Sequence, residues 1–197
     1  MNKITEQTPQ PAIASVHKAA QLVKEKNTVK VKRYEALCGV LLLGSYGDKL
    51  CLCDWQVEKH HDHVARRLKR MLCAEFEAGT SAVIEKAVCQ LDEFFAGKRK
   101  EFDVPLLFVG TDFQKTVWNE LLKIPFGKTI SYGEMAQRIG MPKAVRAVAN
   151  ANGANAMSIF APCHRVIGSN HSLTGYAGGL PAKKFLLELE SQPRLAL

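Results

Sequence analysis

The sequence of 197 residues contains no apolar run of the length that a membrane-spanning helix needs. Its N-terminal segment, MNKITEQTPQPAIASVHKAAQ, lacks the apolar centre of a secretory signal. There is no internal repeat and no low-complexity tract. Hydrophobic residues make up 47% of the chain, which is enough to build a core. We therefore expect a soluble, cytoplasmic protein with no membrane partner.

The six cysteines have irregular spacings, and a chain of this length does not need disulfides for its stability. We therefore do not expect a disulfide framework. Metal binding is another possible role for some of these cysteines. Cys51 and Cys53 precede a histidine cluster formed by His60, His61 and His63. These C-x-C and H-H-x-H spacings differ from the usual zinc patterns, so we predict no metal site and keep a structural zinc as the less favoured alternative.

The formal net charge is +8, which indicates an anionic partner. Nucleic acid is the usual partner of such a surface. A basic surface that is merely solvated is the alternative, and charge alone does not decide between them.

The pattern of the first half predicts a tail followed by an α/β domain. Residues 1–28 have no clear period and are assigned to the tail. Alternating segments between residues 28 and 55, separated by turn residues, predict an antiparallel sheet. Apolar periodicity predicts helices over residues 63–78 and 81–96. We place the N-terminal domain at residues 29–105, ending in an extended segment, FDVPLLFV.

The second half, residues 106–197, is predicted to be a mainly helical domain, so that the fold class is α+β. A helix is expected from Asp112, as its cap, to Pro125. Ser131 and Glu134 fit the S-x-x-E capping box of a short helix ending near Gly140. Pro142 suits the first turn of the next helix, and a final helix is predicted to start at Pro181.

The two short helices on either side of Gly140 form a helix-turn-helix candidate. On the second helix, Lys143, Arg146 and Asn150 are predicted to share one face with Ala147 and Ala151. Val145, Val148 and Ala149 are expected on the opposite, core-facing side. Arg146 is the one long cation in the middle of the exposed face, which favours backbone contact and insertion over reading of base edges. An ordinary helical hairpin is the alternative.

The stretch APCHRVIG places Cys163 next to His164. Cys163 could be a buried small hydrophobe, a metal ligand or a reactive thiolate. Adjacent side chains point in different directions, so His164 could act as its base only through a bridging water or a looped backbone. Glu190, on the inward side of the last helix, is a candidate to orient the imidazole. Arg165 or a helix N-terminus could lower the pKa of the cysteine.

Three segments together resemble the O6-alkylguanine-DNA alkyltransferase family: PCHRVIG, LTGYAGGLPAKKFLLELE and FGKTISYGEMAQRIGMPKAVRAVANANGANAMSIFA. The resemblance is almost continuous over residues 112–190. It implies direct repair of double-stranded DNA, in which an alkyl group moves from O6 of guanine, or O4 of thymine, to a cysteine. The implied enzyme is a methylated-DNA–protein-cysteine S-methyltransferase that flips the damaged base, acts once, needs no cofactor and works as a monomer.

The resemblance also implies roles for individual residues. Cys163 would accept the alkyl group, and His164 with Glu190 would keep its thiolate available through a water. Tyr132 would protonate the leaving guanine, while Arg146 would fill the space of the flipped base. The lesion pocket and its support would comprise Asn152, Asn155, Val166, Tyr176, Ala177, Gly178 and Lys183.

Three positions depart from the common family pattern and bear on lesion size. Asn152 stands where a bulkier apolar residue is frequent, Ala177 where some members have serine, and Ser158 where many have proline. Three other functions stay open: an alkyltransferase-like protein that binds lesions without transfer, a sequence-specific regulator, and a thiol hydrolase. The presence of Cys163 disfavours a protein that only binds lesions. The small number of base-reading side chains disfavours a sequence-specific regulator, and the lack of a clear oxyanion loop disfavours a thiol hydrolase.

Overall fold

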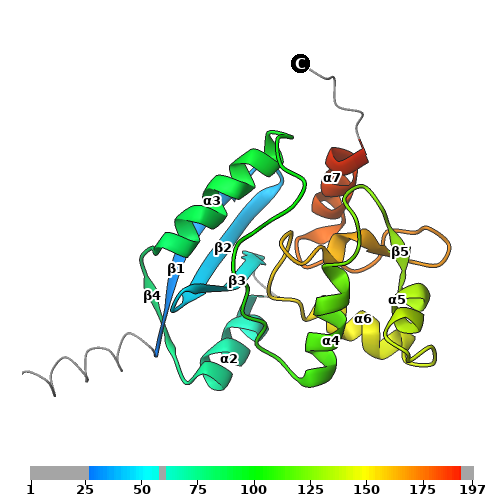
Figure 1. Ribbon diagram of the computed structural model, residues 1–197, viewed down its shortest axis with the longest axis horizontal. Helices are drawn as coiled ribbons and strands as arrows, with labels where there is room; N and C mark the ends of the chain where they lie inside the picture. Colours follow the sequence, from blue (N-terminus) through cyan, green and yellow to red (C-terminus); the bar gives the residue numbers. More distant parts are fainter. Residues whose placement is uncertain (1–26, 58–60, 192–197) are drawn as a thin grey trace, which may run out of the picture.

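The computed structural model describes residues 27–57 and 61–191, which form a sheet-based N-terminal part and a mainly helical C-terminal part (Figure 1). The predicted tail lies outside these ranges except for its last two residues, and Thr28 already begins the first strand. No helix in the described ranges is both long and apolar enough to cross a bilayer.

The N-terminal sheet has the strand order β3-β2-β1-β4. β1 (Thr28–Ala36), β2 (Gly39–Tyr46) and β3 (Lys49–Trp55) are joined antiparallel, as predicted. α3 (Ala82–Phe95) lies across this sheet (Figure 1) and contacts its three long strands. Ser81 caps α3 by accepting a hydrogen bond from the backbone of Ile84, so the helix predicted over residues 81–96 is confirmed.

The helix predicted over residues 63–78 is wrong in its second half. α2 (His61–Leu72) ends before Cys73, whose φ of 48° is incompatible with a continuing helix. Glu75–Ala78 instead form β4, which pairs parallel to β1, so the sheet is mixed and not purely antiparallel. Phe76 packs against a buried cluster while Glu75 and Glu77 stay exposed, which is the two-residue period of a strand.

The C-terminal part consists of short elements that surround Cys163. The helices are α4 (Asp112–Leu121), α5 (Tyr132–Arg138), α6 (Val145–Gly153) and α7 (Gly179–Ser191). A single 3-10 turn, η1 (Cys163–Arg165), carries the cysteine. Two short strands, β5 (Ile130–Ser131) and β6 (Val166–Ile167), pair in parallel and were not predicted.

Several helix ends differ from the predictions. Thr111, not Asp112, caps α4 in a reciprocal capping box with Gln114, and α4 ends at Leu121, before Pro125. α6 begins only at Val145, because residues 142 and 143 form a turn. α7 begins at Gly179, before Pro181. Gly140, with φ of 73°, follows α5 as the predicted left-handed residue.

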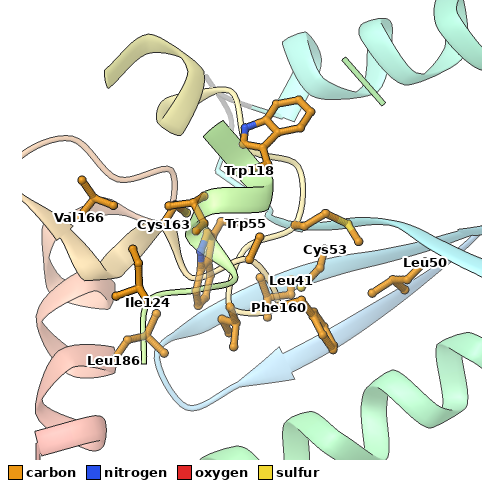
Figure 2. Close-up of a cluster of buried hydrophobic side chains, with 14 of the residues drawn as sticks. Leu41, Leu50, Cys53, Trp55, Trp118, Ile124, Phe160, Cys163, Val166 and Leu186 are labelled. Atoms are coloured by element: carbon orange, nitrogen blue, oxygen red, sulfur yellow. The ribbon is translucent and has the colours of Figure 1, made fainter. Parts of the chain in front are cut away.

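β3 joins the two parts through backbone hydrogen bonds. The Cys53 N–H donates to Ala156 O at 2.7 Å, and Ser158 N–H donates to Cys53 O at 2.7 Å. Leu50 pairs in the same way with the extended segment around Leu106, within which the predicted domain boundary falls. One buried cluster runs across the junction and contains residues of both parts; among them Figure 2 labels Leu41, Trp55, Phe160, Cys163 and Leu186.

Candidate active site

Cys163 opens η1 and is only 4% exposed, within the shared core. The parallel pair β5–β6 connects this turn to α5: β6 follows η1, and β5 leads directly into Tyr132, the first residue of α5. Ser131 caps α5 by accepting a hydrogen bond from the Glu134 backbone at 3.0 Å. The local sequence SYGE therefore starts α5 at Tyr132, directly after the strand that pairs with β6, which follows the cysteine turn.

His164 and Glu190 form a buried pair. The distance from His164 Nε2 to Glu190 Oε1 is 2.8 Å, and both side chains are fully buried. Burial opposes ionisation of Glu190, but the hydrogen bonds from His164 and Arg165 hold its pKa at about 2. An ionised carboxylate can only accept, so Nε2 carries the imidazole proton and Nδ1 is free to act as a base. Nδ1 is buried and has no hydrogen-bond partner among the residues that the structure describes.

Arg165 completes this arrangement by binding the same carboxylate. Its Nε and Nη2 atoms donate to the two oxygens of Glu190, each at 2.9 Å, and Nη1 donates to Ile124 O at 2.6 Å. The pairing is two-pronged, which suits the planar guanidinium. The sequence suggested Arg165 as a group that lowers the pKa of Cys163, but its partner here is Glu190. Its position directly after His164 was the only signal in the sequence.

The environment keeps both members of the Cys163–His164 pair uncharged at neutral pH. Burial raises the pKa of the Cys163 thiol to about 11, although Asn155 and the Lys183 ammonium act in the opposite direction. Burial likewise lowers the pKa of His164, against the influence of Glu190. The site thus holds a thiol and a neutral imidazole beside an ion pair, so the thiolate that the resemblance implies would have to form during the reaction.

Asn152, in the last turn of α6, and Asn155, just after this helix, hold the backbone around the cysteine. Asn155 Nδ2 donates to Ala161 O at 2.9 Å, and its Oδ1 accepts from the Met157 backbone at 3.0 Å. Asn152 Nδ2 lies 3.4 Å from Cys163 O. Both side chains are buried, so these polar groups act inside the core, where unpaired ones would be costly.

A cavity of about 410 Å³ lies between α5, α6 and the segment before α7. Tyr132, Tyr176 and Ala177 line it, together with Ala149, Asn150, Gly153, Thr174 and Gly175. The other predicted pocket residues lie outside the lining: Asn152, Asn155, Val166, Gly178 and Lys183. Lys183 is buried and donates from Nζ to Val166 O at 2.7 Å and to Thr174 O at 2.8 Å, which ties β6 to the start of the cavity loop.

Burial raises the pKa of Tyr132, against hydrogen bonding by the Thr174 and Asn152 side chains. The phenol therefore stays protonated at neutral pH and can donate a proton in the cavity that it lines.

The predicted DNA-facing residues are only partly on one face. Arg146, Ala147 and Asn150 are exposed on α6, and no ion pair of the described residues involves Arg146. Lys143 is exposed too, but in the turn before the helix. Ala151 was predicted on the same face and is instead buried, because it follows Val148 by three residues and shares its inner side.

Two further deviations concern the helix-turn-helix candidate, at Val145 and Ala149. Ala149 was expected on the core-facing side, but it is only half-buried and lines the cavity. Val145 was expected in the core and is 37% exposed, because it is the first residue of α6. The carbonyl of Ala151 accepts a hydrogen bond from Trp118 Nε1 at 2.8 Å, which anchors the end of α6 on α4.

Sequence reasoning missed two residues of the N-terminal part that reach this region. Arg67 of α2 donates from Nη2 to Ala154 O at 2.7 Å and lies over the Trp118 ring, 5.2 Å from its centroid. Trp55 of β3 donates from Nε1 to the Tyr176 hydroxyl at 3.0 Å. No local pattern could have identified either contact, since each joins residues far apart in the chain.

The described residues contain no group of three His, Cys, Asp or Glu side chains arranged to hold a metal ion. His60, one of the residues considered for zinc, lies outside the described ranges, and the side chain of His61 is not described either.

Residues 112–192 match the family model described as 6-O-methylguanine DNA methyltransferase, DNA binding domain. A methylated-DNA–protein-cysteine methyltransferase of Methanosarcina acetivorans is 59% identical over 101 residues, which cover 51% of this chain and 65% of that protein. The match thus spans less than two thirds of that relative.

Solved structures extend the similarity to the N-terminal part. The O6-methylguanine methyltransferase of Mycobacterium tuberculosis is 41% identical with a TM-score of 0.72, covering 83% of this chain and 93% of that one. Mycobacterium tuberculosis OGT in complex with DNA is 42% identical with a TM-score of 0.72, again covering 83% and 93%.

Proposed function

The chain belongs to the family of 6-O-methylguanine DNA methyltransferases, and from this premise we propose that it repairs double-stranded DNA directly. In this proposal an alkyl group moves from O6 of guanine, or O4 of thymine, to the sulfur of Cys163. The product is a thioether on the protein and an undamaged base. No cofactor takes part, and one protein molecule acts on one lesion as a monomer.

The single observation that carries the proposal is the buried set of His164, Glu190 and Arg165 next to the cysteine. An alkyl carbon requires a soft nucleophile, and a thiolate is the best one that a side chain offers. Because the pKa of Cys163 is about 11 at rest, the thiol needs a base at the moment of reaction. Neutral His164 supplies one at Nδ1, and the carboxylate of Glu190 stabilises the imidazolium that forms.

The transfer conserves protons and electron pairs. The thiol proton passes to Nδ1 of His164 through a bridging water, the S–C bond forms, and the bond between the alkyl carbon and O6 breaks. The leaving guanine takes a proton from the Tyr132 hydroxyl, which regains one from His164 through solvent. The net change is the exchange of the alkyl group for one proton. Restoring the cysteine would require a nucleophile to break the S–C bond of a neutral thioether and expel a thiolate, and the described residues of the site supply no such group, so the reaction ends after one event.

The base must leave the stack before its O6 can reach a buried sulfur. α6 suits this task because its exposed face is lined by small residues around Arg146, so the helix can approach DNA closely. We assign to Arg146 the role of filling the space of the flipped base. Lys143 and Asn150 would contact the backbone beside it, and the cavity lined by Tyr132 and Tyr176 would receive the base.

The test is the intact mass of the protein after incubation with a duplex that contains O6-methylguanine. We expect one methyl group to be added to the wild type and to Cys89→Ala, which alters an exposed cysteine on α3, and none to Cys163→Ala. Binding of the methylated duplex by the wild type without any gain in mass would contradict transfer and support a protein that only recognises lesions.

A further inference from the structure

Trp55 connects the N-terminal sheet to the wall of the proposed lesion pocket. It is the last residue of β3, and only 1% of it is exposed. It belongs to the same buried cluster as Cys163 (Figure 2). The sheet has no part in the proposed chemistry, so this contact calls for a separate explanation.

The Trp55 indole packs closely against the cavity loop, residues 174–178, which lies before α7 and lines the cavity with its first four residues. Trp55 Nε1 donates to the Tyr176 hydroxyl at 3.0 Å, and the two rings meet edge to face with centroids 6.1 Å apart. A Cβ at Gly178 would lie 2.7 Å from the indole, well inside contact distance. The backbone at Gly178 therefore rests directly on Trp55, and a bulkier residue on either side would push the loop outward.

Trp55 itself cannot easily withdraw from this loop. Cys53, two residues before it, is hydrogen bonded through both backbone groups to Ala156 and Ser158 of the C-terminal part. On its other side the indole meets Gly39, where a Cβ would lie 3.1 Å away. The indole is thus held between β2 and the loop, in a core that has little room to relax.

The loop that Trp55 holds in place also contacts the proposed reacting groups. Thr174, Gly175, Tyr176 and Ala177 line the cavity together with Tyr132. Lys183 binds Thr174 O at the start of the loop, so Trp55 and Lys183 hold its two ends. The Tyr176 ring also packs edge to face on His164, with centroids 6.4 Å apart.

We propose that Trp55 is a positioning residue that sets the width of the lesion pocket and thereby the size of alkyl group that Cys163 accepts. This inference rests on the proposed function. A large, rigid side chain behind Tyr176 and Gly178 keeps the loop close to the flipped base, which favours a small methyl adduct. A smaller side chain leaves space behind the loop, so the loop can retreat from a bulky adduct.

The experiment compares single-turnover rates with two duplexes, one containing O6-methylguanine and one O6-benzylguanine. We expect Trp55→Leu to slow methyl transfer and to raise the benzyl-to-methyl rate ratio by roughly tenfold, the size of effect that pocket volume has on substrate choice. Trp55→Phe keeps most of the ring but loses the N–H donor, so a smaller rise is expected. It serves as the test if Trp55→Leu does not fold.

Leu68→Ala is the matched control. Leu68 is fully buried on α2, in a separate cluster that does not touch the loop, so its truncation destabilises the N-terminal part without altering the pocket. We expect its rate ratio to equal that of the wild type. An unchanged ratio in folded Trp55 variants, or the same change in Leu68→Ala, would overturn the inference. Failure of the wild type to transfer either group would overturn the proposed function instead.

Discussion

Glu190 determines the charge of the proposed site at the residue scale. It accepts hydrogen bonds from His164, from Arg165 and from the Gly127 backbone at 3.0 Å, all in a region closed to solvent. An ionised group can stay in such a place only when it is well paired. Its negative charge offsets the guanidinium and sets the tautomer of His164, so one carboxylate supports both the fold and the proposed chemistry.

Replacing this carboxylate is expected to reduce activity and stability together. In Glu190→Gln the imidazolium loses its counter-charge, and we expect alkyl transfer to slow by roughly 100-fold or more. The variant also leaves Arg165 buried without an anion, which should cost about 3 kcal/mol of unfolding free energy. Single-turnover kinetics and urea unfolding measure the two effects. Glu188→Gln, on the exposed side of α7, should change neither.

The stability effect of Glu190 has a defined pH dependence. Its pKa in the folded protein, about 2, lies below the ordinary value of 4.5, so the folded state favours the ionised form. The stabilisation is complete above about pH 4.5 and is lost as the pH falls toward 2. We expect the difference in Tm between the wild type and Glu190→Gln to shrink when the pH is lowered from about 5 to about 3. A constant difference would contradict the pairing.

Capping is the decisive local feature at the scale of elements. Ser131 caps α5 and Thr111 caps α4, each by accepting a backbone hydrogen bond three residues on. Removing either side chain oxygen should cost about 1 kcal/mol. Only the α5 cap adjoins Tyr132, so we expect Ser131→Ala to slow transfer severalfold while Thr111→Ala does not. Equal rates in the two variants at equal loss of stability would exclude a role of this cap in orienting Tyr132.

The position of Arg146 on α6 allows base flipping to be tested separately from alkyl transfer. Arg146 was expected in the middle of the helix, but α6 begins at Val145, so Arg146 is exposed in its first turn. Cys163 and the His164–Glu190 pair are buried in the core. We expect Arg146→Ala to reduce the transfer rate from a methylated duplex by about tenfold or more, while the reaction with free O6-benzylguanine stays the same, because a free base needs no extrusion. Comparable losses on the two substrates would refute the assigned role.

The sequence predicted helices and strands correctly where residues close together in the chain determine them. The apolar stripe of α3 and the S-x-x-E start of α5 are each formed by residues close together in the chain, and both helices were predicted correctly from them. β4 was wrongly predicted as the end of a helix. Its four residues include only one large apolar side chain, so their hydrophobic pattern cannot distinguish a strand from a helix. What makes Glu75–Ala78 a strand is the free edge of β1, which is distant in the chain.

Net charge acts at the scale of the whole molecule. With a formal charge of +8, binding to DNA should release counterions, and log K should fall linearly with log salt concentration. We expect Lys143→Ala, next to α6, to reduce this slope by about 1, as the loss of one phosphate contact does. Lys30→Ala, on β1 in the sheet, is the control that should leave the slope unchanged. A slope that does not depend on Lys143 would place the DNA elsewhere.

The sequence alone determined the local features on which the proposed chemistry rests: a cysteine next to a histidine, a capped helix that begins at Tyr132 and a helix of small residues around Arg146. These features depend on neighbours in the chain, so composition and spacing reveal them. Only the tertiary structure decided which groups meet. It paired Arg165 with Glu190 instead of Cys163, moved Ala151 into the core and brought Trp55 against Tyr176. Such contacts arise because burial joins distant segments and favours partners for the polar groups that it encloses, a condition that no local pattern expresses.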